Sequence, residues 1–178
     1  DSAGIPLIMA GPDVAEGKVV SDPVTLADFF PTAIECAGEP LEDADSGIPG
    51  KSLFEVAKGQ HAGRTILSEY HATCSTTGIS MIRKEQYKYV HYVKYRPQLF
   101  DLQKDPNELN DLATDPAYTE VLSECEKALR TVVDPDAADQ LAKNDQIQRI
   151  KDFGGRDSIA KRGTFGYTPA PGEPVIYG

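Results

Sequence analysis

The chain has 178 residues, a formal net charge of −10 and 40% hydrophobic residues, which is enough for one sizeable folded core. Its acidic balance and the lack of a large basic patch exclude general binding to nucleic acid. The three cysteines are widely spaced and predict neither a disulfide framework nor a zinc site. No apolar run approaches membrane-spanning length and no signal peptide is recognisable, so we expect no membrane partner.

The first apolar stretch indicates a large sheet. Ile5–Ala10, bounded by Gly4 and Gly11, is typical of a strand buried on both faces of a parallel sheet. Only one βα unit follows it, so the neighbouring strands that would satisfy its backbone are missing from the sequence. We therefore predict that the chain is part of a larger protein.

A helix is predicted after this strand. Thr25 and Asp28 have the spacing of a capping box, and an apolar stripe continues to a stop at Gly38. Pro31 lies inside the helix and is expected to kink it. A second, short helix is predicted over residues 53–57.

A small antiparallel sheet is predicted next. Tyr87, Tyr89 and His91 alternate with Lys88 and Val90, and this two-residue period is typical of a strand. The four predicted strands are residues 65–71, 78–83, 86–95 and 98–102.

Helical patterns dominate the rest of the chain. A turn at Asp105-Pro106 predicts a helix start through Leu112. Residues 117–132 have a clear helical stripe and are expected to pack across one face of the sheet. Another helix is predicted from Pro135, and the residues from Arg156 onward are expected to form an extended arm.

Several stretches of the chain resemble the sulfatases of the alkaline phosphatase superfamily, in particular the arylsulfatase and choline-sulfatase-like branch. The longest is residues 87–113, with YKYV followed by QLFDLQKDPNELNDLA, which is similar to the small C-terminal sheet of that family. Ser2–Pro12, Asp28–Thr32 and Gly50–Leu53 resemble family segments that precede it.

The resemblance implies the fold class and the domains. We expect an α/β protein with an α+β C-terminal subdomain, in which the end of an alkaline-phosphatase-like core precedes a four-stranded antiparallel sheet with a packed helix. Residues 1–62 are assigned to the core remnant, 63–133 to the sheet and its helix, and 134–178 to a helix and an extended tail.

The resemblance also implies a reaction. Sulfatases cleave sulfate esters with a formylglycine made from a Cys/Ser-x-Pro-x-Arg motif, while a divalent cation, usually calcium, holds the sulfate oxygens. No cysteine or serine of this chain stands in that motif, and the family's metal-binding aspartates are absent. We expect no catalytic residue, no metal site and no cofactor in this chain, and we expect formylglycine and metal in the parent enzyme.

Three residues are predicted to line the substrate pocket of the complete enzyme, namely His71, Ser75 and Thr76. They follow the first strand of the small sheet, and the resemblance implies that this loop approaches the mouth of the active site. The alternative is a histidine that is satisfied at a surface or interface. Cys74 lies in the same loop without a nearby base or helix start, which favours an inert thiol.

The basic strands allow two interpretations. Their cations form either a rim that attracts a sulfated substrate, or a solvated surface that faces acidic helices, which we favour. The residues concerned are Arg83, Lys84, Lys88, Lys94 and Arg96.

We therefore predict the C-terminal portion of a sulfatase that is inactive alone. Two alternatives stay open: the same portion of a phosphodiesterase or phosphonate monoester hydrolase, and a non-catalytic oligomerisation or interaction module. The expected partners are the remainder of the catalytic domain and, through the C-terminal tail with Phe165 and Tyr177, a second copy of the chain.

Overall fold

The computed structural model describes residues 4–72 and 75–163. The chain divides into two units, Asp1–Pro135 and Asp136–Gly178. The predicted oligomerisation tail falls on residues 164–178, outside the described residues, and stays a prediction.

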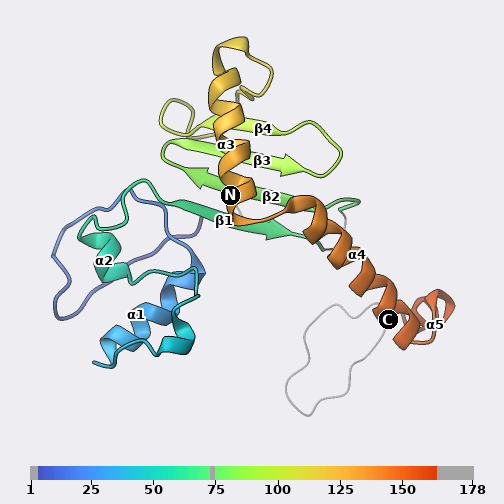
Figure 1. The fold of residues 1–178 in the computed structure, drawn as a ribbon, viewed down its shortest axis with the longest axis horizontal. Helices are drawn as coiled ribbons and strands as arrows, with labels where there is room; N and C mark the ends of the chain where they lie inside the picture. The colour runs from blue at the N-terminus through green and yellow to red at the C-terminus, as the bar shows by residue number, and fades with distance from the viewer. Residues whose placement is uncertain (1–3, 73–74, 164–178) are drawn as a thin grey trace. The chain divides into compact units, whose positions relative to one another are not determined.

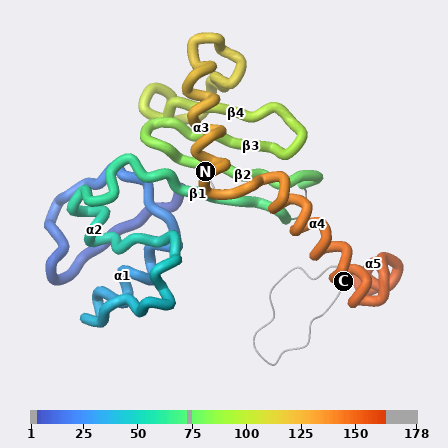
Figure 2. Tube along the Cα trace, in the orientation of Figure 1, coloured from blue at the N-terminus to red at the C-terminus, as the bar shows by residue number. Residues whose placement is uncertain are grey.

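A four-stranded antiparallel sheet lies in the first unit (Figures 1 and 2). Its strands pair in chain order, β1-β2-β3-β4, as expected when consecutive strands are joined by short connections. Their bounds are β1 Thr65–Tyr70, β2 Ile79–Lys84, β3 Tyr87–Tyr92 and β4 Gln98–Asp101. The predicted antiparallel sheet is confirmed, but β3 is shorter than the range 86–95. Lys94 has a φ of 68°, a left-handed conformation that takes the chain out of the strand.

One helix covers one face of this sheet. The 3-10 turn η3 (Pro116–Tyr118) leads into α3 (Thr119–Val132), which contacts β1, β2 and β3 (Figure 1). The register places Ile82 opposite Tyr89, and Tyr89 opposite Leu99, so these side chains share the face that α3 covers. These three side chains form the buried core together with two residues of α3, Cys125 and Leu129.

The segment after β4 was predicted to start a helix near Leu112, and this prediction is wrong. The structure has turns and irregular backbone over residues 102–115. Aspartate side chains hold these turns in place of helical hydrogen bonds: Asp101 accepts from the N–H groups of Gln103 and Lys104 at 3.1 and 3.2 Å. Such local bonds let short acidic side chains compete with helix formation.

The same segment closes the outer edge of β4. The Leu99 N–H donates to Asp111 Oδ1 at 3.1 Å, and the Leu99 carbonyl accepts from the Leu112 N–H at 2.8 Å. Arg96 then pairs with Asp111 at 3.0 Å. The stretch that resembles the sulfatases is therefore a structural motif that fixes the end of the sheet.

The N-terminal segment differs from its prediction. Ile5–Ala10, predicted as a buried strand, forms no strand, and Ile8 is 90% exposed. Within the described residues no strand lies beside this segment, so its backbone has no ladder to join.

The predicted helix near Pro31 forms in two pieces. The 3-10 turn η1 (Leu26–Asp28) precedes α1 (Phe29–Cys36), and the carboxylate of Asp28 accepts from the Thr25 N–H at 2.9 Å, as a capping box requires. Pro31 therefore lies in the first turn of α1, where an N–H has no helical partner in any case. Pro31 thus stands near the start of a helix and not in its middle, as had been predicted.

Asp28 joins three segments of the first unit. It is fully buried and accepts two hydrogen bonds from Arg64, at 2.9 and 2.8 Å, and one from the Lys51 N–H at 2.8 Å. The backbone at Gly50 passes so close that a Cβ there would lie 2.0 Å from the carbonyl oxygen of Ala27. Only glycine fits this close approach without moving the backbone.

The remaining helices are short or exposed. The turn η2 (Asp43–Asp45) leads to α2 (Leu53–Ala57), where the Ser52 hydroxyl accepts from the Phe54 N–H as an N-cap. The helix predicted from Pro135 forms as α4 (Pro135–Asp152), most of which lies in the second unit.

The prediction of an extended arm from Arg156 onward is wrong for the first residues of that range. Residues Arg156–Arg162 form helix α5, with Asp157 in its first turn and Lys161 and Arg162 in its last, a charge order that favours a helix. No helix in the described residues has the length and apolar character needed to cross a membrane.

Candidate functional site

The connection between β1 and β2 carries the three residues predicted to approach a substrate. Its far end is anchored on the sheet, because the Thr77 hydroxyl donates to the Val93 carbonyl at 2.8 Å and the Val93 N–H donates to the Gly78 carbonyl at 3.2 Å. Its near end continues directly from β1. The loop is therefore short and held at both ends.

His71 lies at the near end of this loop. Its Nε2 atom is 3.3 Å from Oε1 of Glu69, two residues back on β1. Side chains two residues apart on an extended chain point to the same side, which explains the contact. Glu69 was not singled out from the sequence, although this two-residue spacing was a usable signal.

Ser75 and Thr76 lie further along the loop. The Ser75 hydroxyl donates to the Thr77 carbonyl at 2.5 Å, and its N–H donates to the Ala72 carbonyl at 3.3 Å, which closes a turn. Thr76 is exposed. The two hydrogen bonds of Ser75 hold the serine inside the loop, whereas the threonine lies at the surface. Cys74 falls outside the described residues.

The basic strand residues are mostly paired with acids. Lys88 contacts Glu108 at 2.6 Å, and Lys84 contacts Glu124 at 4.0 Å. Arg96 pairs with Asp111, as described above, and Arg83 donates to a backbone carbonyl. This pairing supports the interpretation of a surface that faces acidic segments over that of a rim for a sulfated substrate.

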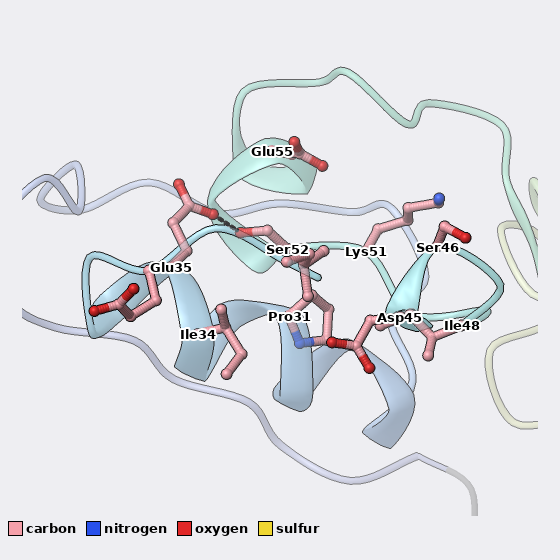
Figure 3. Close-up of a pocket in the computed structure, with 12 residues that line it drawn as sticks. Pro31, Ile34, Glu35, Asp45, Ser46, Ile48, Lys51, Ser52 and Glu55 are labelled. Carbon is pink, nitrogen blue, oxygen red and sulfur yellow. Dashed lines mark hydrogen bonds between the residues drawn. The ribbon is translucent and has the colours of Figure 1, made fainter. Parts of the chain in front are cut away.

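A shallow pocket of about 360 Å³ lies between α1, η2 and the segment before α2 (Figure 3). No sequence pattern predicts it. Four carboxylates line it, those of Glu35, Glu39, Asp45 and Glu55, against the single cation of Lys51. The Glu35 carboxylate accepts a hydrogen bond from the Ser52 hydroxyl across the pocket (Figure 3). An acidic lining repels a sulfated ligand, so this pocket does not fit a sulfate site.

Buried titratable groups in the core are not activated. Burial raises the pKa of the Cys125 thiol, which keeps it protonated and unreactive. Burial, with a smaller contribution from the nearby Glu126, raises the pKa of Tyr89 to about 12. Neither group has the depressed pKa of an activated nucleophile.

The described residues do not fit the metal or the formylglycine of a sulfatase. No group of three or more histidine, cysteine, aspartate or glutamate side chains in residues 4–72 and 75–163 is placed to hold a metal ion. The sequence contains no Cys/Ser-x-Pro-x-Arg motif. No catalytic step is therefore assigned to this chain.

Comparison with known proteins gives a consistent result. The family model for the C-terminal part of N-sulphoglucosamine sulphohydrolase matches residues 1–135. Arylsulfatase K of Danio rerio is 35% identical over 139 residues, which cover 75% of this chain and 26% of that relative. Arylsulfatase K of Homo sapiens is 34% identical over 141 residues, with 74% and 26% covered.

The chain thus spans about a quarter of the length of the curated relatives it matches. Among solved structures, Ps i-CgsB aligns with a TM-score of 0.52 and 24% identity, covering 65% of this chain and 26% of that one. This likeness concerns the fold alone.

Proposed function

The chain belongs to the family of N-sulphoglucosamine sulphohydrolase C-terminal domains, and from that membership we propose that it serves a sulfuric ester hydrolase whose catalytic centre lies in another part of the parent protein. One observation carries the proposal: the chain keeps the sheet-closing motif of residues 98–113 but has no formylglycine motif. We assign the formylglycine and the divalent metal to that other part, because the residues of this chain do not provide a site for either group. The relatives named Arylsulfatase K suggest aryl sulfate esters as assay substrates.

The chain alone is expected to hydrolyse no sulfate ester, because its sequence has no formylglycine motif and its described residues hold no metal-binding group. The measurement is aryl sulfate turnover by the purified 178 residues, with the complete enzyme as the positive control. A buffer blank and a complete enzyme with its formylglycine cysteine or serine changed to alanine set the background. Turnover by the isolated chain above that background would overturn the proposal. A complete enzyme that prefers phosphate or phosphonate esters would favour the phosphonate hydrolase alternative.

We assign the chain two tasks in the parent enzyme. The first is to cover one side of the catalytic domain. Large apolar side chains of the N-terminal segment and of the η1–α1 region face solvent, with Leu26 77% exposed and Phe29 69% exposed in addition to Ile8. Exposed apolar side chains of this size gathered in two segments indicate an interaction surface. The remainder of the sulfatase is the proposed occupant.

Replacing Phe29 with aspartate in the complete enzyme is expected to lower its thermal unfolding midpoint by roughly 5–10 °C, because a charge would enter a buried apolar interface. The matched control is Leu141→Asp on α4, which is 63% exposed and lies outside residues 1–135. Differential scanning fluorimetry compares the two variants. Equal midpoints for both variants and the unchanged enzyme would contradict the proposed interface.

The second task is to present the β1–β2 loop to the substrate. His71, Ser75 and Thr76 are the proposed contact residues, as predicted from the sequence. Two structural features support this: the loop is held at both ends, and His71 is held by a specific partner rather than packed in the core. Changing His71 to alanine in the complete enzyme is expected to raise KM, and unchanged kinetic constants would contradict this task.

A further inference from the structure

We propose that the face of the sheet opposite α3 is a second contact surface for the remainder of the parent sulfatase, and that an apolar surface of that remainder covers it. This inference rests on the proposed function, because it takes the chain to be one part of a larger hydrolase. It concerns a different surface from the exposed side chains of the N-terminal segment and of the η1–α1 region.

The face opposite α3 lacks the polar side chains of a solvated sheet. An antiparallel sheet that is covered on one side usually alternates apolar and polar residues along each strand. Here most of the side chains that point away from α3 are apolar or aromatic. We call the part of this face over β1, β2 and the end of β3 the open sheet face, and its residues are Ile66, Ser68, Tyr70, Ile79, Met81 and Tyr92.

Solvent reaches the open sheet face. Tyr70 is 47% exposed, Ser68 is also exposed, and the other four residues are only partly buried. The register places Ile79 directly between Tyr70 and Tyr92, so two aromatic side chains flank an isoleucine in one row. Contiguous apolar side chains that solvent can reach indicate an interaction surface.

Burial on this face is complete near β4 and decreases towards β1. Val90 and Phe100 are 7% and 6% exposed, whereas Tyr70 on β1 is 47% exposed. Near β4, the segment after that strand also reaches this face, because Glu108 contacts Lys88 of β3 at 2.6 Å. The half of the face over β1 and β2 is therefore the half that a partner would cover.

The charges beside the open sheet face favour a neutral, apolar partner. The ammonium of Lys88 is compensated by Glu108, and Nε of Arg83 donates to the carbonyl of Glu85 at 3.0 Å. The strand residues of β1, β2 and β3 that point to this face include no acid. Covering the face with apolar side chains would thus leave no buried carboxylate without a partner.

The length of the relatives argues for the remainder of the parent protein as this partner. The chain covers 26% of Arylsulfatase K of Danio rerio, so roughly three quarters of a parent of similar length lies outside the chain. The matching family model describes a C-terminal part. Since α3 covers the other face of the sheet, the open sheet face is the side available to that larger part.

The experiment is thiol labelling of the complete enzyme. Ser68→Cys reports on the open sheet face, and Ser123→Cys is the matched control because Ser123 is exposed on α3. Maleimide labelling is followed by mass spectrometry of the peptides, which separates these thiols from all others, and each rate is divided by the rate in urea-unfolded enzyme. Ser68→Cys is expected to react at least about tenfold more slowly than Ser123→Cys, because labelling requires the contact to open.

A second measurement introduces a charge at the same position. Lysine is well tolerated on a solvent-exposed edge strand, so Ser68→Lys would be harmless if the open sheet face met only water. Under a buried contact, Ser68→Lys is expected to lower the thermal unfolding midpoint of the complete enzyme by roughly 3–5 °C. Ser68→Thr, which is neutral and suits a strand, is expected to leave the midpoint unchanged.

Neither measurement uses turnover, so failure of this contact can be told apart from failure of the proposed function. Equal labelling rates for the two cysteines in an enzyme that hydrolyses aryl sulfates would overturn the contact alone. Protection of Ser68→Cys that disappears on dilution would show that a second copy covers the face, which also overturns the proposal. An unchanged midpoint in Ser68→Lys would have the same consequence.

Discussion

Replacing Asp28 with asparagine is expected to lower the free energy of unfolding of the chain by about 3–5 kcal/mol, the range for breaking a buried ion pair on one side. Asp28 is fully buried, and the side chain of Arg64 is only 12% exposed. Asparagine has the same shape but carries no charge, so the guanidinium is left without a compensating anion. Its amide N–H₂ group also faces donors where two carboxylate oxygens accepted.

The matched control for this variant is Asp43→Asn, at an exposed position in η2. Surface changes of this kind usually alter stability by less than about 0.5 kcal/mol. Urea unfolding followed by circular dichroism compares both variants with the unchanged chain. If the two variants unfold at the same urea concentration, Asp28 does not hold the three segments together.

The same residue makes the stability depend on pH. Burial alone would raise the pKa of Asp28, but hydrogen bonds from Arg64 and from the N–H groups of Lys51 and Thr25 outweigh it and lower the pKa below its ordinary value of 3.8. A carboxyl with a lowered folded pKa adds stability that is fully present above pH 3.8. That stability is lost as the pH falls through the pKa that Asp28 has in the folded chain. Asp28→Asn is therefore expected to show a weaker loss of stability in acid than the unchanged chain.

Replacing Leu129 with alanine is expected to cost about 2–5 kcal/mol, because the cavity left in a packed core adds to the lost transfer free energy. Leu129 is 0% exposed and lies in the cluster with Ile82, Tyr89 and Leu99. It is the point where α3 is held on the sheet.

Val132→Ala provides the control on the same helix, since Val132 is 50% exposed. Chemical unfolding of both variants measures the difference. If Leu129→Ala and Val132→Ala differ by less than about 1 kcal/mol, then α3 does not form the core with the sheet in solution.

Local patterns predicted the sheet well. The alternation around Tyr89 places the apolar side chains of one sheet face under α3. The helical stripe of residues 117–132 supplies the apolar side chains of α3 that pack against them, so both partners of the core can be recognised from local patterns. Ile5–Ala10 failed for the opposite reason. Its pattern is that of a buried strand, but no strand lies beside it within the described residues, and it forms none.

Other failures came from side-chain hydrogen bonds that a periodicity does not reveal. Asp101 and Asp111 bind backbone groups and hold residues 102–115 in turns, although the spacing around Leu112 suits a helix. The pair of Asp28 and Arg64 joins residues 36 positions apart, which no local window detects. Each of these depends on tertiary placement.

The candidate site stays a prediction. His71 was singled out because it follows the first strand of the small sheet, where the resemblance implies an approach to the active site, but its contact with Glu69 was not predicted. The acidic pocket beside α1 was missed, because its lining comes from residues 31–55 and is assembled only when η2 folds back toward the helix (Figure 3).

Because the outer edge of β4 is closed, a further strand could pair with the sheet at only one of its two edges. Asp111 and Leu112 already occupy the outward backbone groups of Leu99, so an incoming chain would find no open ladder on that flank. Within the described residues β1 has a strand on one side only. Any fifth strand, whether from the parent protein or from a second molecule, would therefore have to join at β1, next to the loop that carries His71.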